Sequence, residues 1–444
     1  MEEWQKEFER KLVPAEEAAK KVKSGDKVVF TTGREAYAVG LAIAVRMGEL
    51  KNVKIMVPTP SYDFGWYDEG WQDAFNISII MPTATCQEAV DAKRIDVSLG
   101  TSISMYRPIA STVEADVVLT EVSPPDEKGF CSFGQSLWDK RAQIKLGKIV
   151  IAEVNKNLIR THGDNYVHVS EIDYFVEHIS SGAVPATGSL AGRALKGPQP
   201  YLKDIAKHVN GLINDRDTIQ IGVGRTTEPL VKLGMLNGKK DLGIHSEATP
   251  PGIITLVKEG VITGEYKTTN QGKVVVTSLG GGSKEEMLWA SNNPLFELVG
   301  VDYLNDIRVI ASHDNMVAIN NVLAVDFSGQ STAETLGEKR LSATGGQFPF
   351  VVGSLLSKGG RSIQVLPSTA NGAKISRIMP RLPEGTTITT QYTCTDYLVT
   401  EYGVAHIWGT TSRERAKRLI SIAHPDFRDE LTAEASRMFG KLPD

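Results

Sequence analysis

Short apolar runs rich in valine and isoleucine recur along the whole chain and alternate with stretches of helical character. The first part contains DKVVF, VKIMVP, IDVSLG, ADVVLTEV and GKIVIAEV, and the second contains TIQIGVG, DLGIHS, KVVVTS, RVIASH, VLAVDF and SIQVLP. Continuous apolar runs of this length are typical of strands in sheets that helices cover on both faces. Helical stretches such as residues 35–47 and 413–422 alternate with strands and predict βαβ units. We therefore expect an α/β fold with mainly parallel, open sheets.

The two parts of the chain resemble each other. Residues 26–34 (DKVVFTTGR) and 217–225 (DTIQIGVGR) share the same Asp-to-Gly spacing across a strand, a glycine turn and the start of a helix. Further on, ADVVLTEVS is loosely matched by VLAVDFSG, so two blocks in the same order favour a duplicated α/β domain. The Gly/Pro-rich stretch between 181 and 201 is the natural linker. We expect an N-terminal α/β domain over residues 1–185 and a C-terminal α/β domain over residues 195–444.

Length, composition and charge narrow the class of protein. The chain has 444 residues, which is long for a single core, and its 41% apolar and 23% charged content is ordinary for globular proteins. A net charge of −4 argues against a nucleic-acid partner, which needs a concentrated basic surface. An acidic start and the lack of a long apolar run predict a cytoplasmic protein with no membrane partner. Cys86, Cys131 and Cys394 are far apart, so we expect reduced thiols and no metal site.

Glycine clusters mark two candidate ligand loops. Gly222 and Gly224 follow a predicted strand and open a helix, where free backbone N–H groups can hold a phosphate or an oxyanion. A plain strand-to-helix turn is the alternative, and the incomplete GxGxxG pattern does not support a dinucleotide site. Gly345 and Gly346 lie in the small, polar run SATGGQ, which lets backbone approach a ligand closely.

Glu247 ends the predicted strand LGIHSE, at the sheet edge where open α/β sheets bind ligands. A carboxylate there can serve as base, metal ligand or nucleophile, although a loop or helix-cap acid is the alternative. His245 would point to the same face, and we interpret it as a hydrogen-bonded core histidine. The spacing of His162, His168 and His178 matches no standard metal site, so we expect a polar loop before a helix. No HExxH or GxSxG motif is present.

Several further segments occur together in an order that spans nearly the whole chain. They are VSPPDEKGFCSFG (122–134), IAEVN (151–155), THGD (161–164), GVG (222–224), GIHSE (243–247), AINN (318–321), VDFSGQ (325–330), GGQ (345–347), EYGVA (401–405), RERA (413–416) and IAHPDFR (422–428). In this combination the chain resembles the acetyl-CoA hydrolase/transferase family of CoA-transferases, especially its butyryl-CoA:acetate and 4-hydroxybutyrate branch.

The resemblance implies a transferase that moves CoA from an acyl-CoA donor to a carboxylic acid acceptor. It implies a ping-pong reaction through an acyl-glutamyl anhydride and a glutamyl-CoA thioester on Glu247. Asn320, with Asn321 as the alternative, would orient that glutamate. The CoA-contacting loop would comprise Gly222, Val223, Gly224, Arg225 and Thr226, and the glycine loop near the thioester would comprise Gly345 and Gly346. The expected partners are acyl-CoA, with CoA as substrate rather than bound cofactor, small carboxylic acids, and further copies of the chain in a homodimer or larger oligomer.

Two alternatives and two departures accompany this interpretation. An acyl-CoA hydrolase would use the same glutamate, and a non-catalytic acyl-CoA binding protein would have lost the reaction. The family branch commonly has a Met and larger or acidic residues after the glutamate, whereas residues 248–251 here read Ala-Thr-Pro-Pro. Pro349 stands where the branch has an Asp. We expect these changes to reshape the carboxylic-acid pocket while leaving transfer intact.

Overall fold

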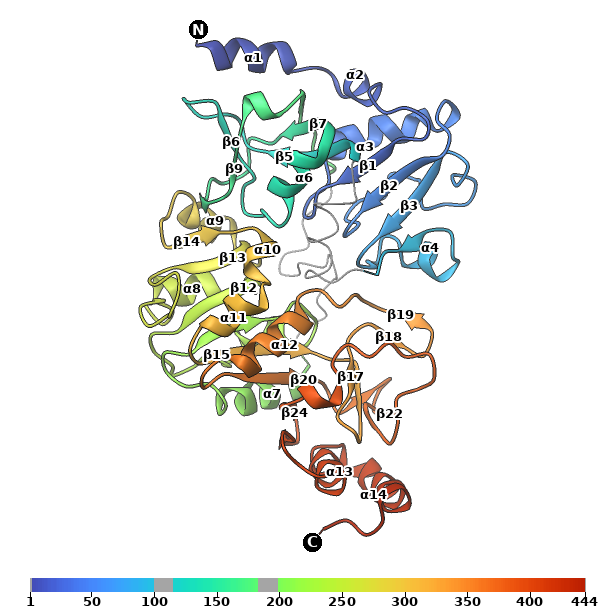
Figure 1. The fold of residues 1–444 in the computed structure, drawn as a ribbon, viewed down its shortest axis with the longest axis vertical. Helices are drawn as coiled ribbons and strands as arrows, with labels where there is room; N and C mark the ends of the chain where they lie inside the picture. The colour runs from blue at the N-terminus through green and yellow to red at the C-terminus, as the bar shows by residue number, and fades with distance from the viewer. Residues whose placement is uncertain (1, 100–114, 183–198, 444) are drawn as a thin grey trace.

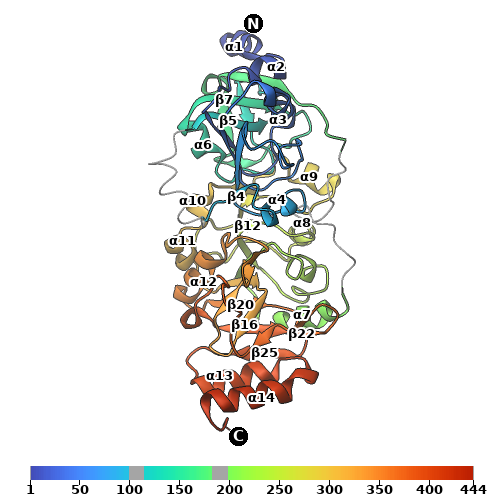
Figure 2. The same ribbon diagram turned by 90° about the vertical axis from the view of Figure 1, so that its right-hand side faces the viewer.

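The computed structural model describes residues 2–99, 115–182 and 199–443. Two α/β lobes follow one another along the long axis of the molecule, with the N-terminus at one end and the C-terminus at the other (Figures 1 and 2). Each lobe is built on a mainly parallel sheet with helices on its faces. The expected α/β class is therefore confirmed.

The N-terminal lobe contains a seven-stranded sheet, among the described residues, in the order β10-β7-β5-β1-β2-β3-β4. All of its strand pairs are parallel. Its strands are β1 (Lys27–Phe30), β2 (Val53–Val57), β3 (Phe75–Ile79), β4 (Asp96–Val97), β5 (Ala115–Val122), β7 (Gly147–Val154) and β10 (Tyr174–Glu177). The other elements of this lobe are α1 (Glu3–Lys11), α2 (Ala15–Ala19), α3 (Tyr37–Ala44), η1 (Val45–Gly48), α4 (Gln87–Asp91), α6 (Lys140–Leu146), η2 (Val169–Glu171) and the strand pair β6 (Phe130–Ser132) and β9 (Tyr166–His168).

The C-terminal lobe contains a nine-stranded sheet, counted over the same described residues, in the order β25-β24-β20-β15-β11-β12-β13-β14-β8. Only β25 runs antiparallel to its neighbour. The strands are β8 (His162–Gly163), β11 (Thr218–Ile221), β12 (Gly243–Ala248), β13 (Val274–Ser278), β14 (Phe296–Leu298), β15 (Met316–Asn321), β20 (Arg361–Val365), β24 (Tyr397–Thr400) and β25 (Gly403–His406).

Helices and short strands complete this lobe. The helices are α7 (Tyr201–Asn210), η3 (Glu228–Leu230), α8 (Ile253–Lys258), α9 (Lys284–Ala290), α10 (Val301–Leu304), α11 (Ile307–Ser312), α12 (Gln347–Leu356), η4 (Tyr392–Cys394), α13 (Ser412–Ser421) and α14 (Pro425–Phe439). The short strands are β16 (Ala324–Asp326), β17 (Ser331–Thr332), β18 (Thr335–Leu336), β19 (Lys339–Arg340), β21 (Thr369–Ala370), β22 (Ile375–Ser376) and β23 (Ile378–Met379). None of the helices described in either lobe is long and apolar enough to cross a membrane.

The two sheets repeat one strand order. In the first, β1 lies between β5 and β2, and in the second, β11 lies between β15 and β12. The registers also correspond, because Phe30 pairs with Leu119 as Ile221 pairs with Ile319. This repetition supports the duplication that the sequence favours.

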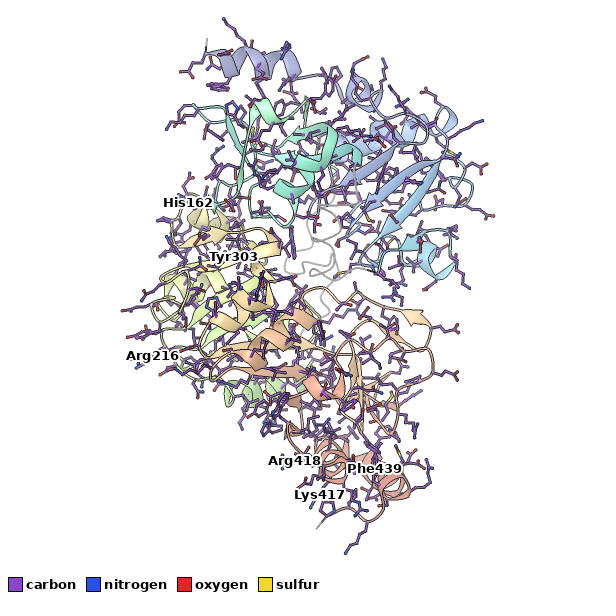
Figure 3. All side chains as sticks on the ribbon, in the orientation of Figure 1. His162, Arg216, Tyr303, Lys417, Arg418 and Phe439 are labelled. Atoms are coloured by element: carbon purple, nitrogen blue, oxygen red, sulfur yellow. The ribbon has the colours of Figure 1, made fainter. Side chains whose placement is uncertain are left out.

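Several connections join the two lobes. Strand β8 comes from the N-terminal half of the sequence but pairs with β14 at the edge of the second sheet, and His162 lies at this junction in Figure 3. The largest core cluster includes residues of both lobes, such as Val150 and Ile244. The expected linker falls mostly on residues 183–198, outside the described residues, so the division into domains 1–185 and 195–444 stays a prediction.

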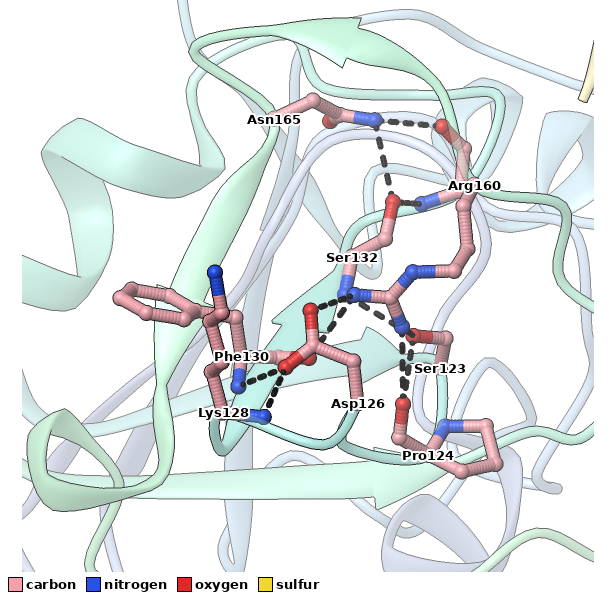
Figure 4. Close-up of polar contacts among 9 residues, drawn as sticks. Ser123, Pro124, Asp126, Lys128, Phe130, Ser132, Arg160 and Asn165 are labelled. Atoms are coloured by element: carbon pink, nitrogen blue, oxygen red, sulfur yellow. Dashed lines mark hydrogen bonds and ion pairs between the residues drawn. The ribbon is translucent and has the colours of Figure 1, made fainter. Parts of the chain in front are cut away.

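Arg160 organises the loop that leads from the first sheet toward the second (Figure 4). Its guanidinium donates to Ser123 Oγ at 3.0 Å, to Pro124 O at 3.1 Å and to Phe130 O at 2.9 Å. It also forms an ion pair with Asp126 at 3.0 Å. A guanidinium presents five donors in one plane. The single side chain of Arg160 can therefore hold both ends of the hairpin formed by residues 123–130. The hairpin precedes the residues that enter the site described below.

Two sequence-based predictions are wrong. The run RVIASH is the helix α11 rather than a strand, because Asp306 caps it by accepting from the Arg308 N–H at 2.8 Å. Its Ile310 packs on Gly353 of α12, as an apolar helix face does. The histidine segment is not a loop before a helix, since His162 lies in β8 and His168 ends β9.

Candidate active site

Glu247 lies near the carboxyl end of β12 and faces a cavity of about 200 Å³ between the two lobes. The C-terminal lobe contributes the loop after β11, the last two residues of β15 and residues 342–347. The N-terminal lobe contributes the residues that follow β1, β2 and β3, together with Trp138. Because parallel strands end at the same edge of a sheet, the cavity collects the carboxyl ends of both sheets. The expected position of Glu247 at a ligand-binding sheet edge therefore agrees with the structure.

Two donors hold the Glu247 carboxylate. Asn305 Nδ2 donates to Oε1 at 2.6 Å, and the backbone N–H of Gly346 donates to the same carboxylate. A Cβ at Gly346 would stand 2.5 Å from the carboxyl carbon of Glu247, so only glycine lets the loop approach this closely. Burial raises the pKa of Glu247, and the hydrogen bonds from Asn305 and Gly346 oppose that shift only in part.

His245 binds the backbone next to Asn305. Asn305 is the C-cap of the short helix α10 and is 2% exposed. His245 is buried, and its Nε2 donates to the carbonyl of Leu304, the last residue of that helix, at 2.9 Å. Burial, with nearby His313 and Lys267, lowers the pKa of His245 well below its usual value, so the ring is neutral. The interpretation of His245 as a core histidine is confirmed.

Asn320 occupies the same cavity but has a different partner. Its side-chain amide makes two reciprocal hydrogen bonds with Gln220, each of 3.0 Å. A Cβ at Gly222 would lie 2.5 Å from Asn320 Oδ1, so Gly222 leaves room for this amide pair. The hydrogen bond to Glu247 comes from Asn305 instead, and a role for Asn320 in orienting Glu247 stays a prediction.

Sequence reasoning missed Asn305. Its local signal is that of a residue ending a short helix, which asparagine commonly does. That signal says nothing about a glutamate 58 positions away. The pair could be recognised only once α10 and β12 were placed side by side.

The predicted CoA loop reaches the cavity in part. Gly222 and Val223 line it, and Asn321 lies beside them. The Gly224 N–H donates to Glu228 Oε1 at 3.1 Å, so in this structure that donor is occupied. Arg225 is exposed and Thr226 is buried, and neither lines the cavity. Gly345 and Gly346 both line it, as expected for the second glycine loop.

The two departures from the family pattern lie behind the cavity wall. Thr249 is buried, and its hydroxyl binds the loop at Gly280 through contacts of 2.9 and 3.1 Å. Pro251 packs against Gly281, where a Cβ would come within 2.5 Å of the proline nitrogen. Pro349 is the third residue of α12, where a backbone N–H has no helical partner to lose. Neither residues 248–251 nor Pro349 lines the cavity in the described structure, contrary to our expectation that they shape it.

A second, larger hollow of about 390 Å³ adjoins the first and shares Ala343 and Thr344 with it. Its wall includes Arg340, whose guanidinium pairs with Glu334 at 3.3 Å. Residues 343 and 344 thus lie between the cavity at Glu247 and this second hollow.

Comparison with known proteins places this geometry in a family. The profile of the acetyl-CoA hydrolase/transferase N-terminal domain matches residues 1–184, and that of the C-terminal domain matches residues 282–435. The 4-hydroxybutyrate coenzyme A transferase of Clostridium kluyveri is 40% identical over 451 residues, which cover 98% of this chain and 100% of that protein. The chain belongs to the acetyl-CoA hydrolase/transferase family. The resemblance inferred from the sequence is confirmed.

Other similar proteins agree with this family assignment. The butyryl-CoA:acetate CoA-transferase of Anaerostipes caccae is 32% identical, with 98% of each chain covered. The crystal structure of the 4-hydroxybutyrate CoA-transferase of Porphyromonas gingivalis matches with a TM-score of 0.79 and 32% identity, covering 98% of this chain and 100% of that one. RipA from Yersinia pestis matches with a TM-score of 0.88 and 29% identity, covering 98% of this chain and 99% of that one. The expected enzyme class, a CoA-transferase, is confirmed by these relatives.

Family membership does not by itself assign the site residues. Glu247 and the loop 222–226 lie between the two matched ranges, whereas Asn305, Asn320 and Gly346 lie within the C-terminal match. The roles of individual residues therefore rest on the geometry.

Proposed function

We propose that Glu247 is the covalent carrier of an acyl-CoA:carboxylate CoA-transferase. The observation that carries this proposal is the Glu247 carboxylate itself, enclosed at the meeting of two sheet edges and held by Asn305 and the Gly346 N–H. A carboxylate is a weak nucleophile in water but a stronger one when it is desolvated and aimed. The raised pKa of Glu247 reports such desolvation.

The first half-reaction has two steps. A Glu247 carboxylate oxygen attacks the thioester carbonyl of the donor, the C–S bond breaks, and CoA leaves as the thiolate with the electron pair. The product on the enzyme is a mixed anhydride of the acyl group and Glu247. The thiolate then attacks Cδ of Glu247, the anhydride C–O bond breaks, and the donor acid leaves as its carboxylate. Glu247 is now a thioester of CoA, and no net proton or electron has been exchanged.

The second half-reaction runs the same steps backward with the acceptor acid. In both halves negative charge builds on an oxygen of Glu247 when its Cδ becomes tetrahedral. Asn305 Nδ2 and the Gly346 N–H already point at that carboxyl group, so they are suited to stabilise the oxyanion without reorganisation. The adjoining larger cavity offers room for more of the acyl-CoA than the 200 Å³ at Glu247 can hold.

The substrates and assembly belong to the same proposal. Relatives are named for 4-hydroxybutyrate, for butyryl-CoA and acetate, and for succinyl-CoA and cyclohexane-1-carboxylate. We propose that this chain uses small carboxylic acids and their CoA thioesters, with CoA as a substrate, and that it acts as a homo-oligomer in the cytoplasm.

Mass spectrometry of the intact protein after addition of acyl-CoA tests the proposal. We expect a CoA adduct on the peptide that contains Glu247, and its removal by an acceptor acid. Glu247→Gln and Glu247→Ala should give no adduct and no transfer, whereas the exposed control Glu338→Gln should behave as the wild type. Persistence of transfer in both Glu247 variants would overturn the proposal, and a wild type that binds acyl-CoA without an adduct would indicate a non-catalytic binding protein.

Hydrolysis through the same glutamate is the second candidate, because the family profiles are described as hydrolase/transferase. Water would then resolve the intermediate in place of an acid. Release of free CoA is the discriminating measurement. A rate without acceptor equal to the rate with acceptor identifies a hydrolase, and a large stimulation by acid identifies a transferase.

A further inference from the structure

Trp138 belongs to the N-terminal lobe and is one of the residues that line the cavity with Glu247. It lies between β6 and α6, just beyond the hairpin that Arg160 fastens, and it is partly buried. It lines the same cavity as Glu247, which comes from the other lobe. No step of the reaction derived above uses this side chain.

The backbone of Trp138 is held in an unfavourable conformation. Its φ is +47°, and it is the one aromatic residue among the described non-glycine residues with positive φ. Bulky residues rarely adopt this region, which costs on the order of 1–2 kcal/mol for a residue with a Cβ. Such strain persists only where the surroundings enforce it, and it concentrates at ligand sites.

Hydrogen bonds to the C-terminal lobe enforce this conformation. The Leu137 and Trp138 N–H groups donate to the carbonyl of Thr277 at 2.9 and 3.4 Å. The carbonyl of Trp138 accepts from the Val301 N–H at 3.1 Å. Two segments of the C-terminal lobe thus hold the peptide groups on both sides of the Trp138 Cα and fix the position of this residue at the cavity.

The same threonine is tied to the reacting glutamate. Thr277 Oγ1 donates to the backbone carbonyl of Glu247 at 2.7 Å. One residue therefore holds the main chain of Trp138 through its carbonyl and that of Glu247 through its hydroxyl. The backbones of Trp138 and Glu247 are therefore held at a fixed spacing, which is what a selective pocket needs.

The chemistry of the surrounding wall indicates what the ring contacts. The N-terminal lobe's share of the lining is mainly apolar, with Ile80, Met81 and Trp138, whereas the C-terminal lobe adds polar side chains such as Asn320 and Gln347. Glu247 is the one charged residue among the described lining residues. An apolar chain gains from packing on the wall that the N-terminal lobe supplies, whereas a second carboxylate would meet no cation among the described lining residues.

We propose that Trp138 is a specificity-determining residue whose indole packs against the hydrocarbon chain of the acid. This inference rests on the proposed function of Glu247. It names the substrate class as monocarboxylic acids whose hydrocarbon chain is apolar and carries no charge. The ring limits the size of the chain. Removing the ring enlarges the pocket, which favours bulky acids. Short-chain acids then lose their contact with the ring.

Three variants separate the ring from the backbone. Trp138→Gly and Trp138→Asn remove the ring but suit a positive φ, since these residues adopt it most readily. Trp138→Phe keeps an aromatic face and shortens it. With one acyl-CoA donor held constant, kcat/KM is measured for butyrate, cyclohexanecarboxylate and succinate as acceptors.

We expect Trp138→Gly and Trp138→Asn to raise the cyclohexanecarboxylate-to-butyrate ratio of kcat/KM at least about 10-fold, the scale of a one-methylene mismatch in a pocket. Trp138→Phe should shift the ratio in the same direction by about 3-fold or more, which keeps the test valid if the other variants do not fold. In the wild type, succinate should be the poorest acceptor.

Equal losses for all acids would overturn the inference, because the ring would then contact the CoA portion or serve only the fold. An unchanged ratio in Trp138→Phe, or succinate preferred over butyrate by the wild type, would also overturn it. In each case the Glu247 adduct would still form. Failure of this inference is therefore distinguishable from failure of the proposed function, in which the adduct itself is missing.

Discussion

Asn305 donates to the resting Glu247 carboxylate, and in the proposed reaction the same amide would donate to the tetrahedral oxyanion. At rest, its hydrogen bond of 2.6 Å favours the ionised carboxyl group and so opposes the rise in pKa that burial causes. In the proposed reaction the same N–H lies beside the oxygen on which negative charge grows. A single amide therefore affects both the pH dependence and the rate.

Replacing Asn305 by Ala should lower kcat by about 10²–10³, the usual cost of one oxyanion donor. It should also move the acid limb of the pH profile to higher pH. The sign follows from the donor: it stabilises the ionised form, so its loss raises the pKa of Glu247 further, and attack requires the ionised form. The measurement is kcat/KM for acyl-CoA against pH.

Asn320→Ala is the matched control for this experiment. Because its amide pairs with Gln220, we expect its acid limb to stay where the wild type has it. A shift in Asn320→Ala and none in Asn305→Ala would mean that Asn320 orients the glutamate, as the sequence resemblance implies.

The adjacent glycines Gly345 and Gly346 offer a second matched pair. A Cβ at Gly346 meets the Glu247 carboxyl group at 2.5 Å, although the backbone there is acceptable to any residue, with φ of −85°. At Gly345 the φ is +53°, but a Cβ meets nothing within 4 Å. Gly346→Ala should therefore abolish adduct formation while leaving the melting temperature nearly unchanged.

Gly345→Ala should do the reverse, with a loss of about 1–2 kcal/mol in unfolding free energy and an intact adduct. Adduct yield by mass spectrometry and denaturant unfolding measure the two effects. Adduct formation by Gly346→Ala at the wild-type rate would show that the loop is not a rigid donor.

Glu247 and Gly346 could be predicted from the sequence because strand ends and glycine loops carry local signals. Asn305 and Trp138 could not. Asn305 meets Glu247 only through the packing of α10 on β12, and the position of Trp138 depends on hydrogen bonds from another lobe. Residues whose function arises from tertiary contact leave no mark in a short window of sequence.

At the scale of elements, the short strand β8 connects the two lobes. Gly163 has φ of +99°, and a Cβ there would stand 2.0 Å from the backbone oxygen of Leu298 in β14. The pairing of β8 with β14 thus depends on a residue with no side chain.

Gly163→Ala should lower the free energy of unfolding by at least about 3 kcal/mol, because it combines backbone strain with a clash against main chain that cannot rotate away. Gly260→Ala is the control, since Gly260 also has positive φ, +73°, but an open surrounding. It should lose only about 1–2 kcal/mol. Equal losses in the two variants, measured by urea unfolding, would mean that β8 contributes little to stability.

The elements that sequence patterns predicted well are the long apolar strands, such as β5, β7 and β13. Consecutive valines and isoleucines predict their burial on both faces. The run RVIASH has a similar composition but forms α11, because the capping Asp306 and the packing of Ile310 on α12 outweigh strand propensity. The two-residue β8 is too short for any periodicity to reveal it.

At the scale of the whole molecule, the sequence predicts the duplication but not what each lobe contributes to the cavity. The repeated DKVVFTTGR and DTIQIGVGR segments predict two related units, and the two sheets do share a strand order. The sequence could not show that the first unit contributes a mainly apolar wall and the second the proposed nucleophile Glu247, because that arrangement exists only in the cavity between them.

The pairing of β8 with the second sheet has one more consequence. Without it, β14 would present a row of unpaired N–H and C=O groups to solvent, which is a template for intermolecular pairing. A C-terminal half expressed by itself would carry that open edge and would tend to aggregate. The first lobe therefore serves the second as a protective cover as well as a partner in the site, and the chain resists being cut into two independent proteins.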